Sequence, residues 1–142
     1  MAEYCTIYCT VLNRDEIARL LNSHFPSSSP ASGDSMEVQG SEGRLRLTVK
    51  VFKESGDDFC RTILGIRAFV KRIESASASA RQDLVGHLDQ SDLAIGVVAE
   101  PAFDADERFH AVVFAIAKAL DGVIFNGHEM LDANGRTLLT AD

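Results

Sequence analysis

The sequence lacks the features that mark several large classes of protein. No stretch approaches the roughly 20 consecutive apolar residues of a membrane-spanning helix, and the N-terminus MAEYCTIYCT lacks the charged-then-apolar plan of a signal peptide. The sequence contains no G-x-G-x-x-G, Walker, G-x-S-x-G or C-x-x-C pattern, so no motif indicates a cofactor or identifies a reaction. We therefore expect a cytoplasmic protein with no cofactor, and a binding or accessory role is favoured over catalysis.

Cysteine is scarce, and its three positions form no disulfide framework. Cys5 and Cys9 lie four residues apart in a predicted strand, which separates them by roughly 13 Å. A disulfide requires Cα atoms within about 7 Å of each other, so this pair cannot be bridged while the strand is intact. Cys60 lies on a predicted helix. We expect three reduced thiols, as in a cytosolic protein.

Basic residues are in the minority. Lysine and arginine number 14 against 21 aspartates and glutamates, which gives a formal net charge of −7. Such an acidic chain is not expected to bind nucleic acid or an anionic membrane surface, although a local basic patch can exist within it. The 142 residues are 46% hydrophobic and 25% charged, which is ordinary for one globular domain that buries its own core.

What the sequence does contain is an alternation of strand and helix patterns. Strands are predicted at 4–12, 36–38, 44–52, 93–99, 123–125, 130–131 and 137–140, and helices at 13–25, from 57, around 84–88 and at 104–121. The Ser/Pro-rich segment 26–35 is predicted to be a mobile loop, and 74–80 to be a low-complexity linker or a frayed helix end. The element order is β-α-β-β-α-(α)-β-α-β-β, in which β-α-β-β occurs twice. We predict a single α+β domain over 1–142, a two-layer sandwich with a mostly antiparallel sheet and helices on one face.

The central element of this fold is the predicted helix within DADERFHAVVFAIAKALDGVIF. Apolar residues at helical spacing occupy one face, and the other face carries little charge, so the helix should be buried on more than one side. Asp104 with Glu107 three residues later predicts the helix start, and Gly122 predicts its end.

The second and third predicted strands form a hairpin whose two faces differ. A turn centred on Ser41-Glu42 places Val38 opposite Leu45 and Glu37 opposite Arg46, so apolar and charged partners both match. The far face of the sheet then carries Tyr4, Thr6, Tyr8, Thr10, Glu37, Arg44, Arg46, Thr48 and Lys50.

Two readings of this far face are open. Tyrosine and arginine are over-represented at binding surfaces, so Tyr4, Tyr8, Arg44, Arg46 and Lys50 are candidate binding residues for a protein partner, a second copy of the chain or a small anionic ligand. The alternative is the ordinary solvated face of an antiparallel sheet.

Several polar clusters are better explained by local structure than by chemistry. Glu107-x-x-His110 lacks the second histidine of a helical metal site, and Asp132-x-Asn134-Gly135 lacks the later ligands of a calcium loop, so no metal site is predicted. Asn126-Gly-His128-Glu129 follows a buried strand, where binding residues often gather, but has no nucleophile or second base nearby in sequence. His24 and His87 lie beside apolar helical faces and are interpreted as packing or capping residues.

The two ends of the chain, YCTIYCTVLNRDEIARLLNSHFP and IAKALDGVIFNGHEMLDANGRTLL, together resemble an N-terminal-type domain of uncharacterised bacterial proteins of unknown function. The shared features are the ALDGVIF helix-to-strand junction and the D-x-x-G-R hairpin. The resemblance implies a bacterial cytoplasmic α+β domain and supplies no catalytic residue. The doubled β-α-β-β order also looks like the architecture of gyrase-inhibitor and SOUL ligand-binding proteins, in which Glu100 would be the candidate carboxylate of a ligand cleft.

Three classes of function remain open from the sequence. The first is a non-enzymatic interaction or accessory module that uses the open sheet face. The second is a small-molecule-binding module, which a roomy pocket with converging polar groups would favour. The third is an enzyme, which requires two titratable side chains within hydrogen-bond reach in a cleft.

Overall fold

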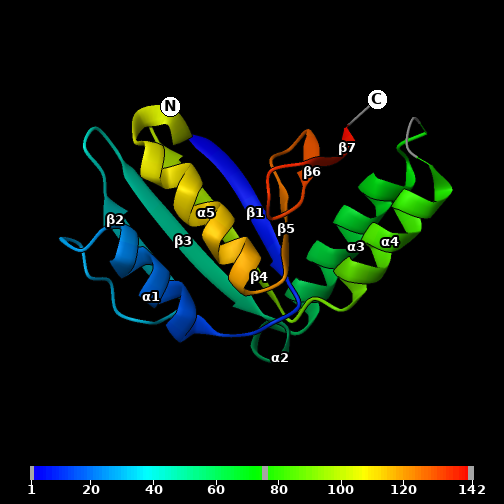
Figure 1. Cartoon of the computed structure of the whole chain (residues 1–142). Coiled ribbons are helices and arrows are strands. Elements are labelled where there is room, and N and C mark those ends of the chain that lie inside the picture. Colours follow the sequence, from blue (N-terminus) through cyan, green and yellow to red (C-terminus); the bar gives the residue numbers. More distant parts are fainter. Residues whose placement is uncertain (1, 75–76, 141–142) are drawn as a thin grey trace.

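A computed structural model describes residues 2–74 and 77–140 and has a seven-stranded sheet in the order β2-β3-β4-β1-β5-β6-β7 (Figure 1). All neighbouring strands are antiparallel. The strands are β1 (Glu3–Cys9), β2 (Ser35–Gln39), β3 (Arg44–Val51), β4 (Leu93–Glu100), β5 (Gly122–Phe125), β6 (Glu129–Leu131) and β7 (Thr137–Thr140). The helices are α1 (Arg14–His24), α2 (Phe52–Ser55), α3 (Asp57–Lys71), α4 (Ala78–Asp89), the 3-10 turn η1 (Phe103–Ala105) and α5 (Glu107–Ala119). The predicted α+β fold with an antiparallel sheet is confirmed.

Helices α1 and α5 cover one face of the sheet. Val112 and Ile116 of α5 are fully buried against strand residues such as Ile7 and Ile95. β4 is apolar on both sides and pairs with β1 and β3, as expected for an inner strand. The helix predicted to organise the core is therefore buried against the sheet and against α1, whereas His110, Ala111 and Lys118 on its outer side are exposed.

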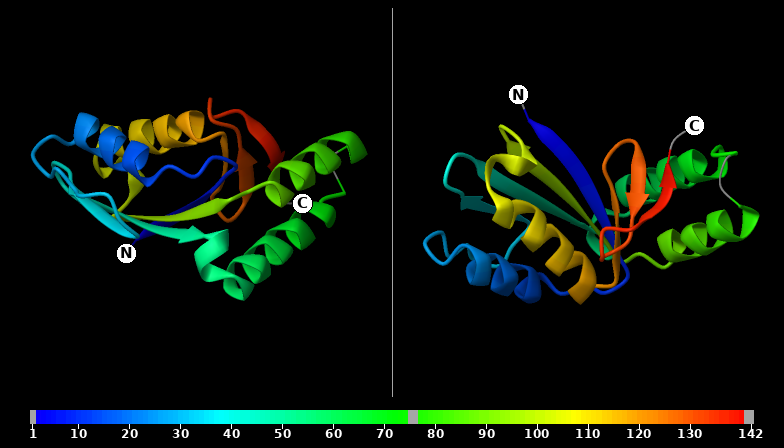
Figure 2. Two further views of the ribbon diagram at one scale, coloured as in Figure 1. Left: turned by 90° about the horizontal axis from the view of Figure 1, so that it is seen from below. Right: turned by 45° about the horizontal axis from the view of Figure 1, so that its top comes forward.

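The prediction that all helices lie on one face is wrong. α3 and α4 form a helical hairpin on the opposite face of the sheet, at the end where β1 finishes (Figure 2). Tyr8, predicted to be exposed there, is only 4% exposed and packs in a second core with α3 and α4. The strand residues that these helices cover include Ala94, Val123 and Met130. β5 and β6 have only four and three residues, so the alternation of apolar and polar residues in their sequences does not reveal that the sheet has a second apolar face.

The register of the β2–β3 hairpin is as predicted. Glu37 lies opposite Arg46 and Val38 opposite Leu45. Asn13 caps α1, since its side chain accepts a hydrogen bond from the backbone of Glu16. The predicted 26–35 loop ends where β2 begins, α4 begins within the predicted 74–80 segment, and residues 75–76 of that segment lie outside the described part of the chain.

α5 begins two residues later than its sequence pattern suggests. Its N-cap is Asp106 rather than Asp104, and Glu107 is its first residue. Asp106 is 5% exposed and accepts hydrogen bonds from Ser41 N (3.0 Å), Ser41 Oγ (3.1 Å) and Arg108 N (2.9 Å). Asp104 lies in η1 and is exposed. The β2–β3 turn, distant in sequence, selects Asp106 as the cap.

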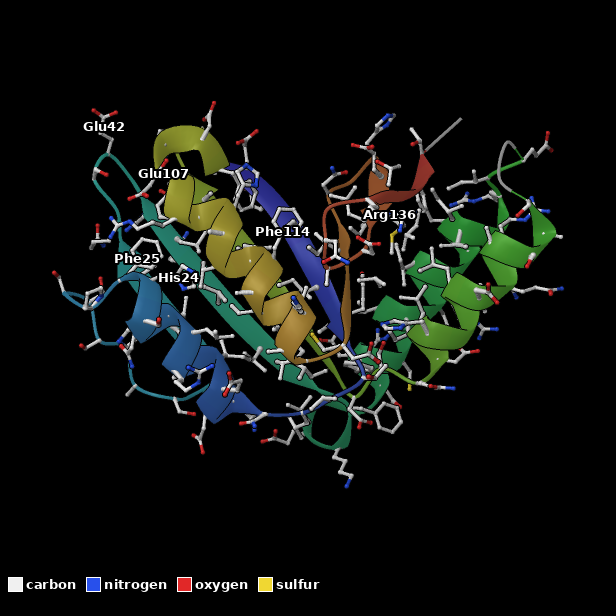
Figure 3. All side chains as sticks on the ribbon, in the orientation of Figure 1. His24, Phe25, Glu42, Glu107, Phe114 and Arg136 are labelled. Atoms are coloured by element: carbon white, nitrogen blue, oxygen red, sulfur yellow. The ribbon has the colours of Figure 1, made fainter. Side chains whose placement is uncertain are left out.

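The same junction holds α1 against α5. The Arg108 guanidinium pairs with Asp106 at 2.7 Å and lies 4.5 Å from the centroid of the Phe25 ring. Phe25, labelled in Figure 3, directly follows the last residue of α1. A Cβ on Gly40 would lie 2.7 Å from Asp106 Oδ2, so the turn can approach this closely only with glycine.

The two β-α-β-β units differ in their spatial arrangement. After α1 the chain enters the edge strand β2 and returns as β3 beside β4. After α5 it enters β5 directly beside β1, and β6 lies farther out. The repeated order of elements is therefore not matched by a repeated strand order.

Among the described residues, none of the helices combines the length and apolar character needed to traverse a lipid bilayer.

Candidate ligand-binding cleft

The two neighbours of β1 pair with different lengths of it. β4 pairs with β1 from Glu3 to Cys9, whereas β5 pairs with it only from Thr6 to Cys9. The first three residues of β1 therefore have no partner strand on the β5 side within the described chain. This leaves a notch in the sheet beside residues 3–5.

The turn after β5 creates the notch. The side-chain oxygen of Asn126 accepts hydrogen bonds from the backbone of His128 (3.0 Å) and Glu129 (2.8 Å), which directs the chain away from β1 and into β6. Gly127 between them has a φ of 96°, a conformation that glycine adopts without steric cost.

Aromatic rings from η1 and α5 line the opposite side of the notch. The rings of Phe103 and His110 have centroids 5.4 Å apart, and those of His110 and Phe114 are 6.3 Å apart and stacked. Residues 110 and 114 are one helical turn apart, so α5 places them in a row. The Glu3 carboxylate accepts a hydrogen bond from the backbone of Phe103 at 2.7 Å and ties η1 to the start of β1.

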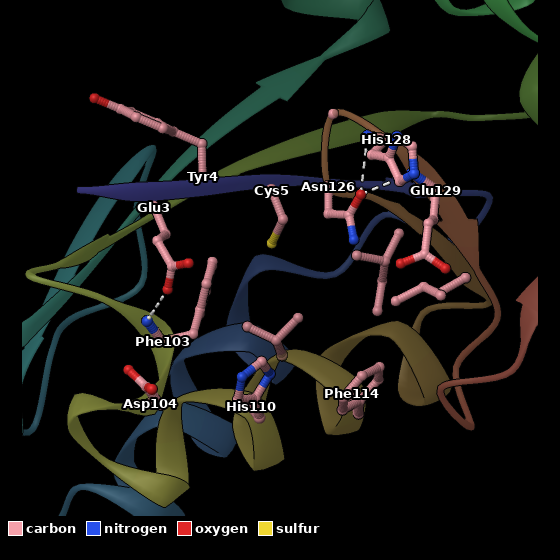
Figure 4. A pocket seen from close by; sticks show the side chains of 14 residues that line it. Glu3, Tyr4, Cys5, Phe103, Asp104, His110, Phe114, Asn126, His128 and Glu129 are labelled. Atoms are coloured by element: carbon pink, nitrogen blue, oxygen red, sulfur yellow. Dashed lines mark hydrogen bonds between the residues drawn. The ribbon is translucent and has the colours of Figure 1, made fainter. Parts of the chain in front are cut away.

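These elements enclose a cleft of about 780 Å³ between β1, α5 and the β5–β6 turn (Figure 4). Its lining residues are Glu3, Tyr4, Cys5, Phe103, Asp104, His110, Val113, Phe114, Ile124, Asn126, Gly127, His128, Glu129 and Leu131. Among these described residues there are three carboxylates and two histidines, and no lysine or arginine. The cleft is therefore apolar inside with an acidic rim.

Cys5, His110 and His128 supply the thiol and the two imidazoles of the cleft. Burial raises the pKa of the Cys5 thiol to about 12, so the thiol is protonated at neutral pH and is a poor nucleophile. In the described part of the chain, no side-chain hydrogen bond joins His110 or His128 to a carboxylate. The described residues also contain no group of three histidine, cysteine or acidic side chains that could hold a metal ion.

The five binding residues predicted from the sequence do not form one site. Tyr4 is 66% exposed on the open part of the far face and also lies at the edge of the cleft. Tyr8 is buried beneath the α3–α4 hairpin, and burial raises its pKa to about 12. Lys50 pairs with Asp58 of α3 at 2.9 Å.

Arg44 and Arg46 both pair with Glu100, at 3.0 and 2.8 Å. The hydrogen bond from Arg44 is the main cause that lowers the pKa of Glu100. Glu100 is therefore a partner of these arginines on the open face and does not line the cleft.

The cleft instead brings together two sequence patterns whose local spacing predicts only a helix start and a loop. His110 comes from the Glu107-x-x-His110 pattern, and the turn residues come from Asn126-Gly-His128-Glu129. No local spacing relates these segments to Glu3, which is 100 residues from Phe103 in sequence.

The Asp132 carboxylate accepts backbone hydrogen bonds within its own turn, as a turn residue should.

Two histidines and two cysteines lie outside the cleft. They are His24, His87, Cys9 and Cys60. His24 bonds to the Leu20 carbonyl at 2.9 Å in its own helix, and a ring nitrogen of His87 lies 3.3 Å from the Tyr8 carbonyl. Cys9 is a buried free thiol, and Cys60 is exposed on α3. These positions agree with packing and capping roles for the two histidines.

Comparison of the chain with protein-family models, curated proteins and solved structures finds no match.

Proposed function

We propose that this protein is a non-enzymatic binding module whose cleft takes a ligand with an aromatic or apolar body and a positively charged group. The observation that carries this proposal is a row of three rings beside an acidic rim that lacks lysine and arginine. A cleft of about 780 Å³ lies within the usual size range of ligand sites.

The chemistry of the lining favours a cation over an anion. Glu3, Asp104 and Glu129 would attract a positive group, and the Phe103 and Phe114 rings can take a cation on their faces. A phosphate or carboxylate ligand would be repelled by the three carboxylates of the lining. The arginines of the open sheet face are already paired with Glu100, which offsets part of their attraction for an anion.

A matched series of small probes tests this charge preference. Phenethylamine, 2-phenylethanol and 3-phenylpropionate share a benzene ring and differ in charge. We expect binding to weaken in that order, as measured by thermal shift and by NMR titration. Equal binding of all three, or tightest binding of the carboxylate, would contradict the proposal.

Substitution of Phe114 locates the probe. Phe114→Ala removes one end of the ring row and should weaken phenethylamine binding about tenfold. Phe52→Ala is the matched control, because Phe52 is a 44% exposed phenylalanine outside the cleft. Binding that both variants weaken equally would place the probe elsewhere.

A second candidate function is self-association through the uncovered part of the far sheet face. Tyr4 is 66% exposed there and lies opposite the partly buried Val98, beside Arg46 and Glu37, so the face offers an apolar centre and both signs of charge. Such a face can complement itself about a two-fold axis. Sedimentation equilibrium tests this candidate: a dimer that Arg46→Glu dissociates supports it, and a monomer at millimolar concentration rejects it.

A further inference from the structure

The backbone hydrogen bonds show which residues of β1 face the notch. Thr10 N–H donates to the Asp121 carbonyl at 3.3 Å and continues the register in which Tyr8 lies opposite Val123. Because the backbone groups of successive strand residues point to opposite edges, every second residue of β1 faces β5. Tyr4 continues this alternation, so its N–H and C=O point into the notch, where no described strand pairs with them.

The lining of the cleft agrees with this direction. Glu3, Tyr4 and Cys5 are consecutive, and all three line the cleft although strand side chains alternate between faces. In Figure 4 the Tyr4 ring and the Cys5 thiol extend to opposite sides of β1. A cleft that touches three successive strand residues runs along the edge of the strand, so its wall includes backbone as well as side chains.

We propose that the ligand of this cleft is a short extended peptide segment that pairs with the backbone of Tyr4 as an added strand. This inference rests on the proposed function and names the class of ligand. Strand addition supplies two backbone hydrogen bonds at Tyr4, and side-chain pockets on alternate residues supply specificity.

The register of an added strand defines where its side chains lie. The residue opposite Tyr4 shares a face with the Tyr4 ring, and the residues on either side of it point toward α5. One of these neighbours should be aromatic or aliphatic and pack against the row of rings. The other should be lysine or arginine and lie near Glu3 and Asp104. The Glu3 carboxylate uses one oxygen for the Phe103 backbone and has a second oxygen for such a cation.

A blocked pentapeptide with this pattern tests the inference. The probe is acetyl-Thr-Phe-Thr-Lys-Thr-amide, with the central threonine intended to lie opposite Tyr4. Its matched control carries an N-methyl group on the central backbone nitrogen, which removes one hydrogen-bond donor and leaves the side chains unchanged. A second control replaces the lysine with glutamate. We expect the N-methyl peptide to bind about tenfold more weakly than the parent.

Amide hydrogen exchange reports the pairing directly. The parent peptide at saturation should slow exchange of the Tyr4 amide at least about fivefold and leave that of Tyr8, which is already paired with β5, unchanged. Equal binding of the parent and N-methyl peptides, or unchanged exchange at Tyr4 while the peptide is bound, would overturn strand pairing.

The probes separate failure of this inference from failure of the proposed function. If phenethylamine binds in the cleft and the parent peptide does not, the peptide inference fails and the proposed function stands; if neither binds, both fail. Asp104→Asn should weaken the parent peptide about twofold to fivefold, and Asp83→Asn, at an exposed position on α4, should not. Equal effects of the two variants would contradict a specific contact with the rim.

Discussion

Two groups of polar side chains, one at the start of α5 and one around the cleft, differ in how completely their hydrogen-bonding capacity is used. In the first group, the buried Asp106 carboxylate accepts bonds from both the backbone and the side chains of Ser41 and Arg108. In the second group, the carboxylates of the cleft rim have few partners: Glu3 accepts from the Phe103 backbone and Glu129 from the Thr137 hydroxyl. The first arrangement stabilises the fold, and the second leaves capacity for a ligand.

The largest expected effect is that of removing the Asp106 carboxylate. Asp106→Ala deletes the helix cap and its bonds to Ser41, so we expect the free energy of unfolding to fall by about 2–4 kcal/mol. Asp104→Ala is the control, because Asp104 is an exposed aspartate two residues earlier, and it should change stability by less than about 0.5 kcal/mol. Urea denaturation measures both. Similar losses in the two variants would mean that Asp106 has no special structural role.

The pH dependence of stability sharpens the same contrast. Hydrogen bonds from Arg108 are the main cause that holds the pKa of Asp106 below its usual range. A carboxyl with a lowered folded-state pKa stabilises the fold at pH values above its unfolded pKa, and this contribution is lost as the pH falls toward and below the folded pKa.

The difference in stability between the wild type and Asp106→Asn should therefore be largest at neutral pH and shrink below about pH 4. Urea denaturation at a series of pH values from 7 to 2.5 measures this difference. The exposed acids with lowered pKa, such as Glu16 and Asp58, are present in both proteins and cancel in the comparison. A difference that stays constant with pH would be evidence against an ionised Asp106 in the fold.

Substitution of His110 should affect the cleft more than the fold. His110 is exposed and lies between Phe103 and Phe114 in the row of rings. His110→Ala should lower stability by less than about 1 kcal/mol and weaken phenethylamine binding about threefold to tenfold. Calorimetric titration gives the affinity, and His128→Ala at the opposite rim provides a comparison. A large loss of stability with no change in affinity would assign His110 to the fold.

The smallest effect is expected on the open sheet face. Arg46 pairs with Glu100 at the surface, and such pairs contribute about 0–1 kcal/mol. Arg46→Ala should therefore change the free energy of unfolding by less than about 1 kcal/mol and leave probe binding unchanged. Loss of phenethylamine binding in this variant would place the site on the open face instead of in the cleft.

The fold was predictable where the signal is local. The turn centred on Ser41-Glu42, together with the alternation of 44–52, predicted the β2–β3 register, and the apolar pattern of 104–121 predicted a buried helix. The position of the α3–α4 hairpin was not predictable. Apolar residues at helical spacing, such as Phe59 and Val70, show that α3 has a buried side but not which face of the sheet it packs against. For this reason Tyr8 was predicted to lie on an open sheet face, whereas it is buried beneath α3 and α4.

The cleft could not be predicted because its parts come from distant segments. It depends on β5 ending at Phe125 while β1 continues to Glu3, which is a difference in strand length seen only after the strands are paired. The turn signal at Asn126-Gly127 was the available clue, since it fixes where β5 stops. The choice of Asp106 over Asp104 as the cap likewise depends on Ser41, 65 residues away.

An NMR titration of the backbone amides with phenethylamine locates the ligand site, because it compares the cleft and the open face in one experiment. We expect saturable shifts at His110, Phe114, Asn126 and His128, with Arg46 and Thr48 unchanged. Shifts centred on Arg46 and Thr48, or no saturable shift at the cleft, would contradict a ligand site in the cleft.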